Sequence, residues 1–241
     1  MSKIFLTGDI HGHIDIDKLK SYRFKRGQKL TKDDYLIILG DFGLIFYQEN
    51  GILAPQEKKN IEWLNSQPWT TLFIDGNHEN FDRLWNTEKY PEIEYYGGKA
   101  SKIADSIYYL HRGQVFNLDG KTFFTMGGAL SIDKYSRTSG ISWWTEEDIR
   151  DVDMEEAFKN LAIHNNKVDY VLTHTCPDII FKDLLDRKYM AGHIKHDPNT
   201  DKLQEIYDKI EFKKWYFGHF HIEAIQEDYA SLYHTIIKLK D

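Results

Sequence analysis

The chain carries Ile4-Phe5-Leu6-Thr7-Gly8-Asp9-Ile10-His11, a short apolar run that stops at two side chains able to bind a metal ion. Such a run, bounded by Gly and Asp, is typical of a buried β-strand. Four later runs stop in the same manner, at Gly40-Asp41, Gly76-Asn77-His78-Glu79, Thr173-His174 and Gly218-His219-Phe220-His221. Because ligands bind outside the carboxyl ends of the strands in an open α/β sheet, we expect these five ends to converge on one site.

Strand-like runs alternate with segments of helical periodicity along the chain. This alternation predicts an α/β sandwich in which the helices lie outside the sheets. The predicted strands cover residues 3–7, 35–39, 70–74, 106–110, 121–126, 170–173, 214–217 and 231–238. The predicted helices cover residues 55–66, 145–161, 177–188 and 201–210. The sequence contains no low-complexity tract or Pro/Gly/Ser-rich linker, so we expect a single domain over residues 1–241.

The composition limits the class of protein. A chain of 241 residues with 41% hydrophobic residues can bury a full core as one α/β domain. Its formal net charge of -7 opposes a general attraction to nucleic acid or to an anionic membrane. Cys176 is the single cysteine, which excludes an intramolecular disulfide, and no apolar run approaches the roughly 18 residues of a membrane span. We therefore expect a cytoplasmic protein without membrane contact.

The motifs GDIHG, GD, GNHE, TH and GHFH, in this order, resemble those of the calcineurin-like metallophosphoesterase superfamily. The resemblance spans residues 8–221 and implies two packed mixed β-sheets flanked by helices, in a single metallophosphoesterase domain. It also implies a centre of two divalent metal ions, in which Asp41 bridges the ions and His78 protonates the leaving oxygen or contacts the phosphate. The implied ligands are Asp9, His11, Asp41 and His221 for the first ion, and Asp41, Asn77, His174 and His219 for the second.

The residue types in these motifs suit the hydrolysis of a phosphoester. A carboxylate between two divalent ions about 3.5–4 Å apart allows a hydroxide to bridge them and to attack phosphorus directly. Two dications carry four positive charges, of which Asp9, Asp41 and the hydroxide cancel three, so about one remains for the phosphate oxygens. Nitrogen and oxygen ligands without sulfur suit Mn²⁺, Fe or Zn²⁺, and the sequence does not choose among them. His78 would donate a proton if its pKa keeps it partly charged near neutrality.

The last motif carries two of the candidate ligands. His219 and His221 alternate with Phe220, and in an extended segment both imidazoles would point to the same side. His193 and His196 lie in a polar stretch that we expect to be a loop flanking the site.

The motifs depart from those of the superfamily's protein phosphatases. Those enzymes have an Asp-Arg pair in the second motif and an arginine before the glycine of the third, where this chain has Asp41-Phe42 and Asp75-Gly76. Both phosphate-clamping arginines are thus missing. We expect a substitute clamp in residues 127–137, with Arg137 as the candidate substrate-binding residue and Trp143-Trp144 nearby to stack a base. The alternative is a surface loop above two buried tryptophans.

Three functions stay open. The first, which we favour, is a hydrolase of phosphomonoesters or phosphodiesters acting on a small phosphorylated substrate of nucleotide-like type. The second is a nuclease or protein phosphatase acting on a macromolecular phosphoester, and the net charge of -7 counts against a nuclease. The third is a non-catalytic metal-binding scaffold, which predicts erosion of the ligand set, whereas every ligand position is filled by a competent residue. The basic residues Arg23, Lys25, Arg26 and Lys29 form either a solvated face or a contact for a polyanion.

Overall fold

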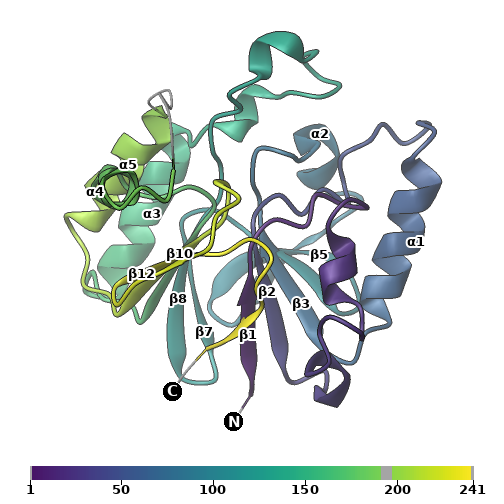
Figure 1. Ribbon diagram of the computed structural model, residues 1–241, viewed down its shortest axis with the longest axis horizontal. Helices are drawn as coiled ribbons and strands as arrows, with labels where there is room; N and C mark the ends of the chain where they lie inside the picture. Colours follow the sequence, from purple (N-terminus) through teal and green to yellow (C-terminus); the bar gives the residue numbers. More distant parts are fainter. Residues whose placement is uncertain (1, 191–196, 240–241) are drawn as a thin grey trace.

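Two β-sheets pack face to face in the computed structural model, which describes residues 2–190 and 197–239. Helices cover the outer face of each sheet (Figure 1). This arrangement confirms the expected α/β sandwich of two packed mixed β-sheets flanked by helices. His193 and His196 lie outside the described residues.

The first sheet has seven strands with a parallel centre. In spatial order the strands are β13 (Ile237–Lys238), β1 (Ile4–Thr7), β2 (Tyr35–Leu39), β3 (Thr70–Ile74), β6 (Ile107–Leu110), β5 (Gly98–Ala104) and β4 (Glu92–Tyr95). Strands β1, β2, β3 and β6 run parallel to one another, and the pairs nearer the edges are antiparallel. The carboxyl ends of β1, β2 and β3 therefore lie along the same edge of this sheet.

The second sheet has six strands and is also parallel at its centre. In spatial order the strands are β11 (Ala224–Ile225), β12 (Tyr229–Ser231), β10 (Lys214–Phe217), β9 (Tyr170–Thr173), β8 (Lys121–Met126) and β7 (Gln114–Leu118). Strands β12, β10, β9 and β8 are parallel, so β9 and β10 also end at one edge. Five motif-bearing strands thus present their carboxyl ends from two facing sheets.

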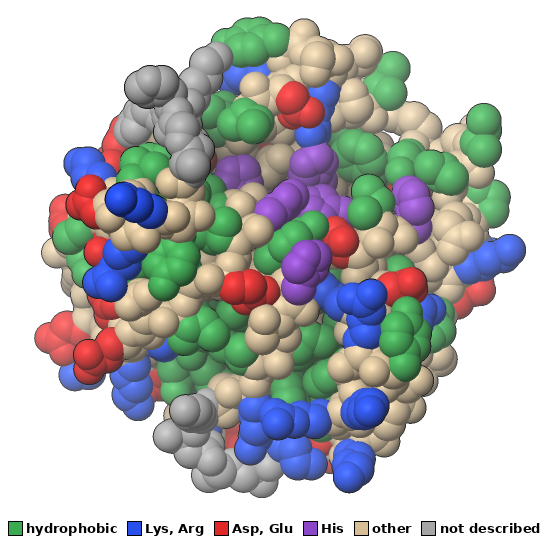
Figure 2. All heavy atoms as spheres, in the orientation of Figure 1, with side chains coloured by type: hydrophobic (Ala, Val, Ile, Leu, Met, Phe, Trp, Pro, Cys, Tyr) green, Lys and Arg blue, Asp and Glu red, His purple; other side chains and the backbone are tan. Residues whose placement is uncertain are grey.

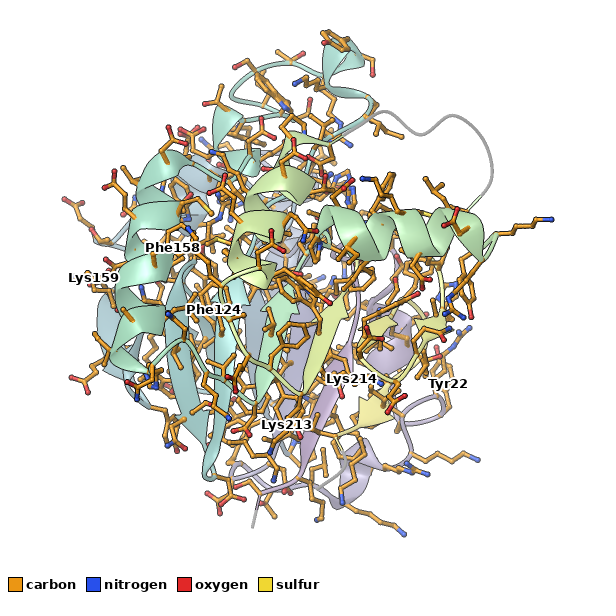
Figure 3. The ribbon with its side chains drawn as sticks, turned by 90° about the vertical axis from the view of Figure 1, so that its left-hand side faces the viewer. Tyr22, Phe124, Phe158, Lys159, Lys213 and Lys214 are labelled. Carbon is orange, nitrogen blue, oxygen red and sulfur yellow. The ribbon has the colours of Figure 1, made fainter. Side chains whose placement is uncertain are left out.

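The helices divide between the two sheets. On one side of the molecule lie α1 (Ala54–Asn65) and α2 (Phe81–Leu84), and on the other α3 (Asp151–Ile163), α4 (Asp178–Asp186) and α5 (Pro198–Tyr207) (Figure 1). Phe158 of α3 packs against the apolar cluster that contains Phe124 of β8, between helix and sheet (Figure 3). Within residues 2–190 and 197–239, no helix has both the length and the apolar character that crossing a bilayer requires.

Alternate side chains of the central strands fill the two faces of each sheet. On β2, Ile37 and Leu39 belong to the cluster between the sheets, whereas Leu36 and Ile38 belong to the cluster that includes Leu64 of α1. Strands that are covered on both faces carry continuous apolar runs, which explains the pattern of the sequence.

The segment 231–238 is not one strand, contrary to the sequence-based expectation. Strand β12 ends at Ser231 in the second sheet, and β13 begins at Ile237 in the first. Between them, the carbonyl of Tyr233 accepts a hydrogen bond from Nζ of Lys18 (2.6 Å), and the carbonyl of Thr235 accepts one from Oγ1 of Thr7 (3.1 Å). These tertiary hydrogen bonds hold the chain where it crosses from one sheet to the other. They therefore separate the apolar segment 231–238 into two short strands.

Further elements differ from expectation. Residues Thr145–Glu147 form a 3-10 turn, and α3 begins only at Asp151, where Asp153 accepts a hydrogen bond from the backbone N–H of Arg150 (2.9 Å). Strands β4, β5 and β7 were not expected, because β4 and β5 carry exposed polar residues near a sheet edge and lack a continuous apolar run.

Candidate metal centre

The motif residues meet where the carboxyl ends of β1, β2, β3, β9 and β10 face one another. Figure 2 shows several histidine side chains gathered in a hollow near the middle of one face of the molecule. Gly76 lies at the centre of this convergence, since a Cβ there would come within 2.2 Å of Oδ1 of Asp41 and 2.7 Å of Nε2 of His174. A glycine is required at this position so that the side chains can approach.

One group of four potential ligands forms around the first motif. Asp9, His11, Asp41 and His221 each offer one ligand atom, and these atoms lie within 4.8 Å of one another. Nε2 of His11 is 3.2 Å from Oδ2 of Asp41, and Nε2 of His221 is 3.1 Å from Oδ2 of Asp9. This is the set that the sequence assigned to the first ion.

A second group forms on the other side of Asp41. Oδ1 of Asp41 is 3.2 Å from Nε2 of His174, which is also 3.2 Å from Oδ1 of Asn77. Nδ1 of His219 is 3.0 Å from the same amide oxygen of Asn77. The two carboxylate oxygens of Asp41 therefore face different groups, so this residue lies between them. The structure brings together all seven residues expected as ligands.

Hydrogen bonds behind these side chains set their orientation. Nδ1 of His11 lies 2.8 Å from Oδ2 of Asp15, and Nδ1 of His174 lies 2.8 Å from the carbonyl oxygen of Leu39. An imidazole that donates through Nδ1 directs the lone pair of Nε2 toward the centre. Sequence reasoning missed Asp15, although its spacing of four residues from His11 was visible.

The amide of Asn77 is oriented in the same way. Its Nδ2 donates a hydrogen bond to Oγ of Ser131 (3.0 Å), which leaves Oδ1 facing His174 and His219. Ser131 belongs to the segment 127–137 that was expected to approach the site, but its contact with Asn77 was not foreseen.

The backbone at four of these residues is left-handed. His11, Asp41, His219 and His221 have φ angles of 39°, 47°, 65° and 54°. Non-glycine residues adopt this region at a cost in free energy, and they do so mainly where surrounding contacts hold them. The expectation that His219 and His221 lie in an extended segment was therefore wrong. Phe220 between them packs against the core of the second sheet and keeps this turn in place.

The carboxylates create a strong negative field. Burial lowers the pKa of His174, but the charge of Asp41 and its hydrogen bond outweigh burial and raise the pKa to about 10. Burial likewise lowers the pKa of His11, whereas the hydrogen bond and charge of Asp41 raise it to about 9. Burial opposes ionisation of Asp41, yet the positive charges of His174 and His78 hold its pKa well below the usual range. The same field would attract a metal cation.

The donor set fits a pair of divalent ions. Oδ2 of Asp9 is buried and, among the described residues, has no hydrogen-bond partner, because its 3.1 Å approach to Nε2 of His221 lacks hydrogen-bond geometry. A buried carboxylate oxygen without a donor is costly unless a cation compensates it. Imidazole, carboxylate and amide donors suit Mn²⁺, Fe or Zn²⁺.

Buried charged groups support the loops that carry the ligands. Glu79 accepts hydrogen bonds from the backbone N–H groups of Phe42 (2.7 Å) and Gly43 (3.2 Å), and so holds the loop that follows Asp41. Nε of Arg112 lies 2.9 Å from Oδ2 of Asp75, just before Gly76-Asn77. Sequence reasoning missed these supports, since a charged residue in a sequence does not reveal its burial.

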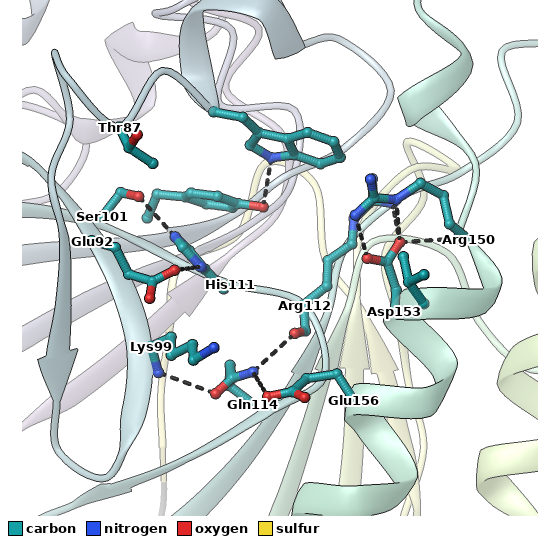
Figure 4. Close-up of a pocket in the computed structure, with 13 residues that line it drawn as sticks. Thr87, Glu92, Lys99, Ser101, His111, Arg112, Gln114, Arg150, Asp153 and Glu156 are labelled. Atoms are coloured by element: carbon teal, nitrogen blue, oxygen red, sulfur yellow. Dashed lines mark hydrogen bonds and ion pairs between the residues drawn. The ribbon is translucent and has the colours of Figure 1, made fainter.

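Arg112 also reaches the helices of the second sheet. Its NH1 group donates hydrogen bonds to Oδ2 of Asp153 (3.1 Å) and to the carbonyl of Asp148 (2.9 Å). Figure 4 shows Arg112 lying beside Asp153 and Arg150 at the wall of a polar cavity. The third motif is thereby tied to the start of α3.

Lys18 and Tyr233 support the first and last motifs. Nζ of the buried Lys18 donates hydrogen bonds to the carbonyls of Gly8 (2.9 Å), Asp9 (2.5 Å) and Tyr233 (2.6 Å). The ring of Tyr233 stacks on the imidazole of His221, with centroids 4.4 Å apart and an interplanar angle of 11°. A candidate ligand with an exposed side chain is thus held by stacking.

The match to known proteins agrees with this geometry. The family model of the calcineurin-like phosphoesterases matches residues 2–223. The chain belongs to this family. A lariat debranching enzyme from Schizosaccharomyces pombe (strain 972 / ATCC 24843) is 25% identical over 210 residues, which cover 79% of this chain and 43% of that enzyme. The chain thus spans less than half the length of this curated relative.

In this phosphoesterase, a cavity of about 600 Å³ opens directly over the metal centre. Polar groups line its floor, among them Asp41, Asn77 and His78, and Arg137 lies on its wall. Apolar side chains form much of the remaining wall, namely Leu130, Ile132, Met190, Phe220 and Ile222. The centre is therefore open to a ligand with both an anionic and an apolar part.

His78 and Arg137 lie against each other at the edge of this cavity. The NH1 and NH2 groups of Arg137 are 3.3 and 3.2 Å from Nδ1 and Nε2 of His78, and Nε2 of His78 is 3.9 Å from Oδ2 of Asp41. Burial lowers the pKa of His78, and the positive charge of Arg137 adds to this effect while Asp41 opposes it. Segment 127–137 thus places a guanidinium beside the third motif.

The two tryptophans have a different place. Trp144 is buried, and its Nε1 donates a hydrogen bond to Oδ2 of Asp82 (2.8 Å). Among the described residues, those that line the cavity include neither Trp143 nor Trp144. The expected base-stacking role has no support in this arrangement, and the alternative of a loop above a buried tryptophan holds for Trp144.

Proposed function

We propose that this protein is a metal-dependent phosphoester hydrolase that acts on phosphomonoesters or phosphodiesters through a centre of two divalent ions. One observation carries the proposal: Asp41 lies between two groups of nitrogen and oxygen donors, and each of its carboxylate oxygens faces one group. Such an arrangement suits two ions that share a carboxylate.

Seven side chains, Asp41 and the six around it, would hold the ions. Asp9, His11 and His221 share one ion with Asp41, and Asn77, His174 and His219 share the other with it. When bound, the ions would supply Lewis acidity and activate a water molecule for direct attack on phosphorus, without a covalent enzyme intermediate. Asp15 and the carbonyl of Leu39 keep His11 and His174 in the orientation that ligation requires.

His78 is proposed as the residue that protonates the leaving oxygen. It borders the cavity beside Asp41, with Nε2 3.9 Å from Oδ2 of that residue. Burial and Arg137 lower its pKa, and the negative charge of a bound phosphoester would oppose both effects. Arg137 is proposed to bind a phosphate oxygen. It would thereby replace the phosphate-clamping arginines that the motifs lack.

The cavity favours a small phosphorylated substrate of nucleotide-like type. Its apolar wall, which includes Leu130, Ile132 and Met190, suits a nucleobase better than a bare sugar phosphate. The ions are proposed to be Mn²⁺, Fe or Zn²⁺ on the basis of the donor types. The buried free thiol of Cys176 is compatible with a cytoplasmic location, which is likewise a proposal.

A panel of phosphoesters assayed with added Mn²⁺ tests this function. Asp41→Asn should lose bound metal and nearly all turnover, because it removes the shared charge. His78→Ala should retain metal and lose rate chiefly on substrates with poor leaving groups. His164→Ala, outside the metal centre at the end of α3, is the matched control and should behave as wild type. Full activity of the Asp41 variant would contradict the proposal.

The panel also separates the alternatives. A nuclease or protein phosphatase would turn over oligonucleotides or phosphopeptides faster than nucleotides, and the name of the debranching relative makes this comparison worthwhile. A non-catalytic scaffold would bind two ions per chain and hydrolyse none of the esters.

A further inference from the structure

A group of exposed cations lies in the connection between β1 and β2, which carries His11 near its start. Arg23, Lys25, Arg26 and Lys29 fall within seven residues, are exposed, and form no ion pair within the described part of the chain. The protein as a whole carries a formal net charge of -7, so this local excess of positive charge runs against the average. Unpaired cations held close together repel one another, and a bound anion relieves that repulsion.

The segment that carries these cations is fixed by packing against the core. Phe24 is buried and packs edge-on against Phe5 and Trp69, with centroid distances of 5.2 and 5.4 Å. A Cβ at Gly27 would lie 2.5 Å from the ring of Phe24, so the turn is tightly packed at that point. The exposed side chains therefore project from a backbone of defined position.

Three of these cations, Arg23, Lys25 and Arg26, border a groove. A cavity of about 480 Å³ is lined by Lys18, Arg23, Phe24, Lys25, Arg26, His234 and Ile236. Figure 2 shows positively charged side chains gathered below the histidines on the same face of the molecule. We call this cavity the cationic groove.

The cationic groove adjoins the metal centre through direct contacts. The ring of His234 lies 4.0 Å from that of Tyr233, which in turn stacks at 4.4 Å on His221. Lys18, on the groove wall, binds the carbonyls of Gly8 and Asp9. The rings of Tyr233 and His234 therefore connect the groove with the candidate metal centre.

We propose that the cationic groove binds the backbone phosphates of a single-stranded nucleic acid whose scissile phosphodiester lies at the metal centre. This inference rests on the proposed phosphoester hydrolysis, and it replaces the small nucleotide-like substrate with an oligonucleotide, the substrate of the nuclease alternative. A single phosphate would engage one or two cations, whereas the three exposed cations that line the groove match a series of phosphates. The exposed ring of Tyr22, next to Arg23, adds a surface for base stacking (Figure 3).

The shape and charge of the surface favour a nucleic acid strand over a membrane. The groove is concave, and its wall residue Lys18 contacts the backbone of Gly8 and Asp9, which suits a flexible strand, while a lipid bilayer presents a broad surface. The acidic remainder of the protein would repel a polyanion elsewhere, so binding would concentrate at this groove.

Binding by the metal-free protein of residues 1–241 tests the groove without any cleavage. A fluorescein-labelled single-stranded RNA of about 12 nucleotides serves as the probe, followed by anisotropy in EDTA over a range of salt concentrations. In the variant Arg23→Gln/Arg26→Gln, the loss of two phosphate contacts should weaken binding roughly 10- to 30-fold near 0.1 M salt. The slope of log K against log salt should fall in magnitude by about 1.4, since each contact contributes about 0.7 for single strands.

The matched control is Lys58→Gln/Lys59→Gln, which removes the same charge from the exposed side of α1. This variant should bind like wild type, and both variants should keep the wild-type melting temperature. Equal losses in both variants, or none in the groove variant, would overturn the proposal. Binding to phosphatidylserine vesicles without binding to the RNA would overturn it as well.

Hydrolysis of bis(p-nitrophenyl) phosphate by the wild-type protein with Mn²⁺ is measured separately. Its absence would refute the proposed function while leaving the binding result as a property of the surface. Its presence, combined with unchanged RNA binding in the groove variant, would refute only the groove.

Discussion

Replacing Arg112 with methionine should strongly destabilise the protein, because it leaves the buried carboxylate of Asp75 without a counter-charge. The side chains of Arg112 and Asp75 are 2% and 0% exposed. Arg112 donates through Nε and NH2 to Oδ2 of Asp75 and through NH1 to Asp153. In the Arg112→Met variant, the hydroxyl of Tyr109 (2.8 Å) would be the remaining donor to the side chain of Asp75 among the described residues.

The expected cost follows from the burial of this pair. Removing one partner of a buried ion pair typically costs about 3–5 kcal/mol, because the other charge stays buried and unpaired. Domains unfold with free energies of about 5–15 kcal/mol, so the variant would lose a large share of its stability. For a chain of this size the melting temperature should fall by roughly 6–20 °C.

Urea unfolding followed by tryptophan fluorescence measures this cost, and the double variant Asp75→Asn/Arg112→Met tests its origin. The double variant removes the stranded charge of Asp75, while Asp153 keeps its ion pair with Arg150 (2.6 Å). It should therefore be more stable than the single variant. If Arg112→Met cost less than about 1 kcal/mol, or if the double variant were less stable than the single, the reasoning from uncompensated burial would be refuted.

Three further predictions concern the centre and its surroundings. Asp15→Asn removes the carboxylate behind His11 and should lower metal affinity about 10- to 100-fold in calorimetric titration, with the fold retained. Gly76→Ala places a methyl group 2.2 Å from Oδ1 of Asp41 and should abolish metal binding in the same titration. Burial raises the pKa of the Glu147 carboxyl from 4.5 to about 8. The folded state therefore binds the carboxyl proton more tightly than the unfolded state does. The stability that this bound proton contributes is lost as pH rises through about 8. As pH rises from 5 to about 8, the free energy of unfolding of Glu147→Gln in urea should therefore increase by roughly 2–4 kcal/mol relative to that of the wild type. A difference in unfolding free energy that did not change with pH would contradict this reasoning.

The positions of the candidate ligands were predictable because parallel pairing places the ends of several strands at one edge of a sheet. A parallel strand that ends in Gly-Asp or Gly-Asn-His delivers that end to the same edge as its neighbours, wherever the strand lies in the sequence. β1, β2 and β3 pair in this way, as do β9 and β10. The strand ends therefore predicted that Asp9 and Asp41 would meet at one sheet edge, and the family resemblance, with its two packed sheets, added His174 from the other sheet.

The supports behind the ligands were not predictable, because burial of a charge depends on distant partners. Lys18 looks like a surface lysine in the sequence, yet it is buried against three carbonyls, one of them 215 residues away at Tyr233. Asp75 and Arg112 neutralise each other across two elements of the fold. Such pairs form only after the strands have met, and periodicity carries no information about them.

The geometry of the last motif was mispredicted for a related reason. Alternation of His219 and His221 suggested an extended segment, but both residues are left-handed, and Phe220 packs into the core. Packing of one aromatic ring and stacking of His221 on Tyr233 override the local preference of the backbone. The residue identities were informative, whereas the conformation depended on tertiary contacts.

An acidic protein can attract an anionic substrate here because its negative charges near the centre are either used or neutralised. Asp9 and Asp41 face the proposed ions, and Asp75, the acidic residue just before the third motif, is paired with Arg112. Arg137 at the cavity wall pairs with Asp133, with Nε 2.8 Å from Oδ1, and its NH1 and NH2 groups face His78. The exposed cations of the cationic groove would add positive potential beside His234. A net charge of -7 therefore says little about the sign of the field that a phosphoester meets as it enters this site.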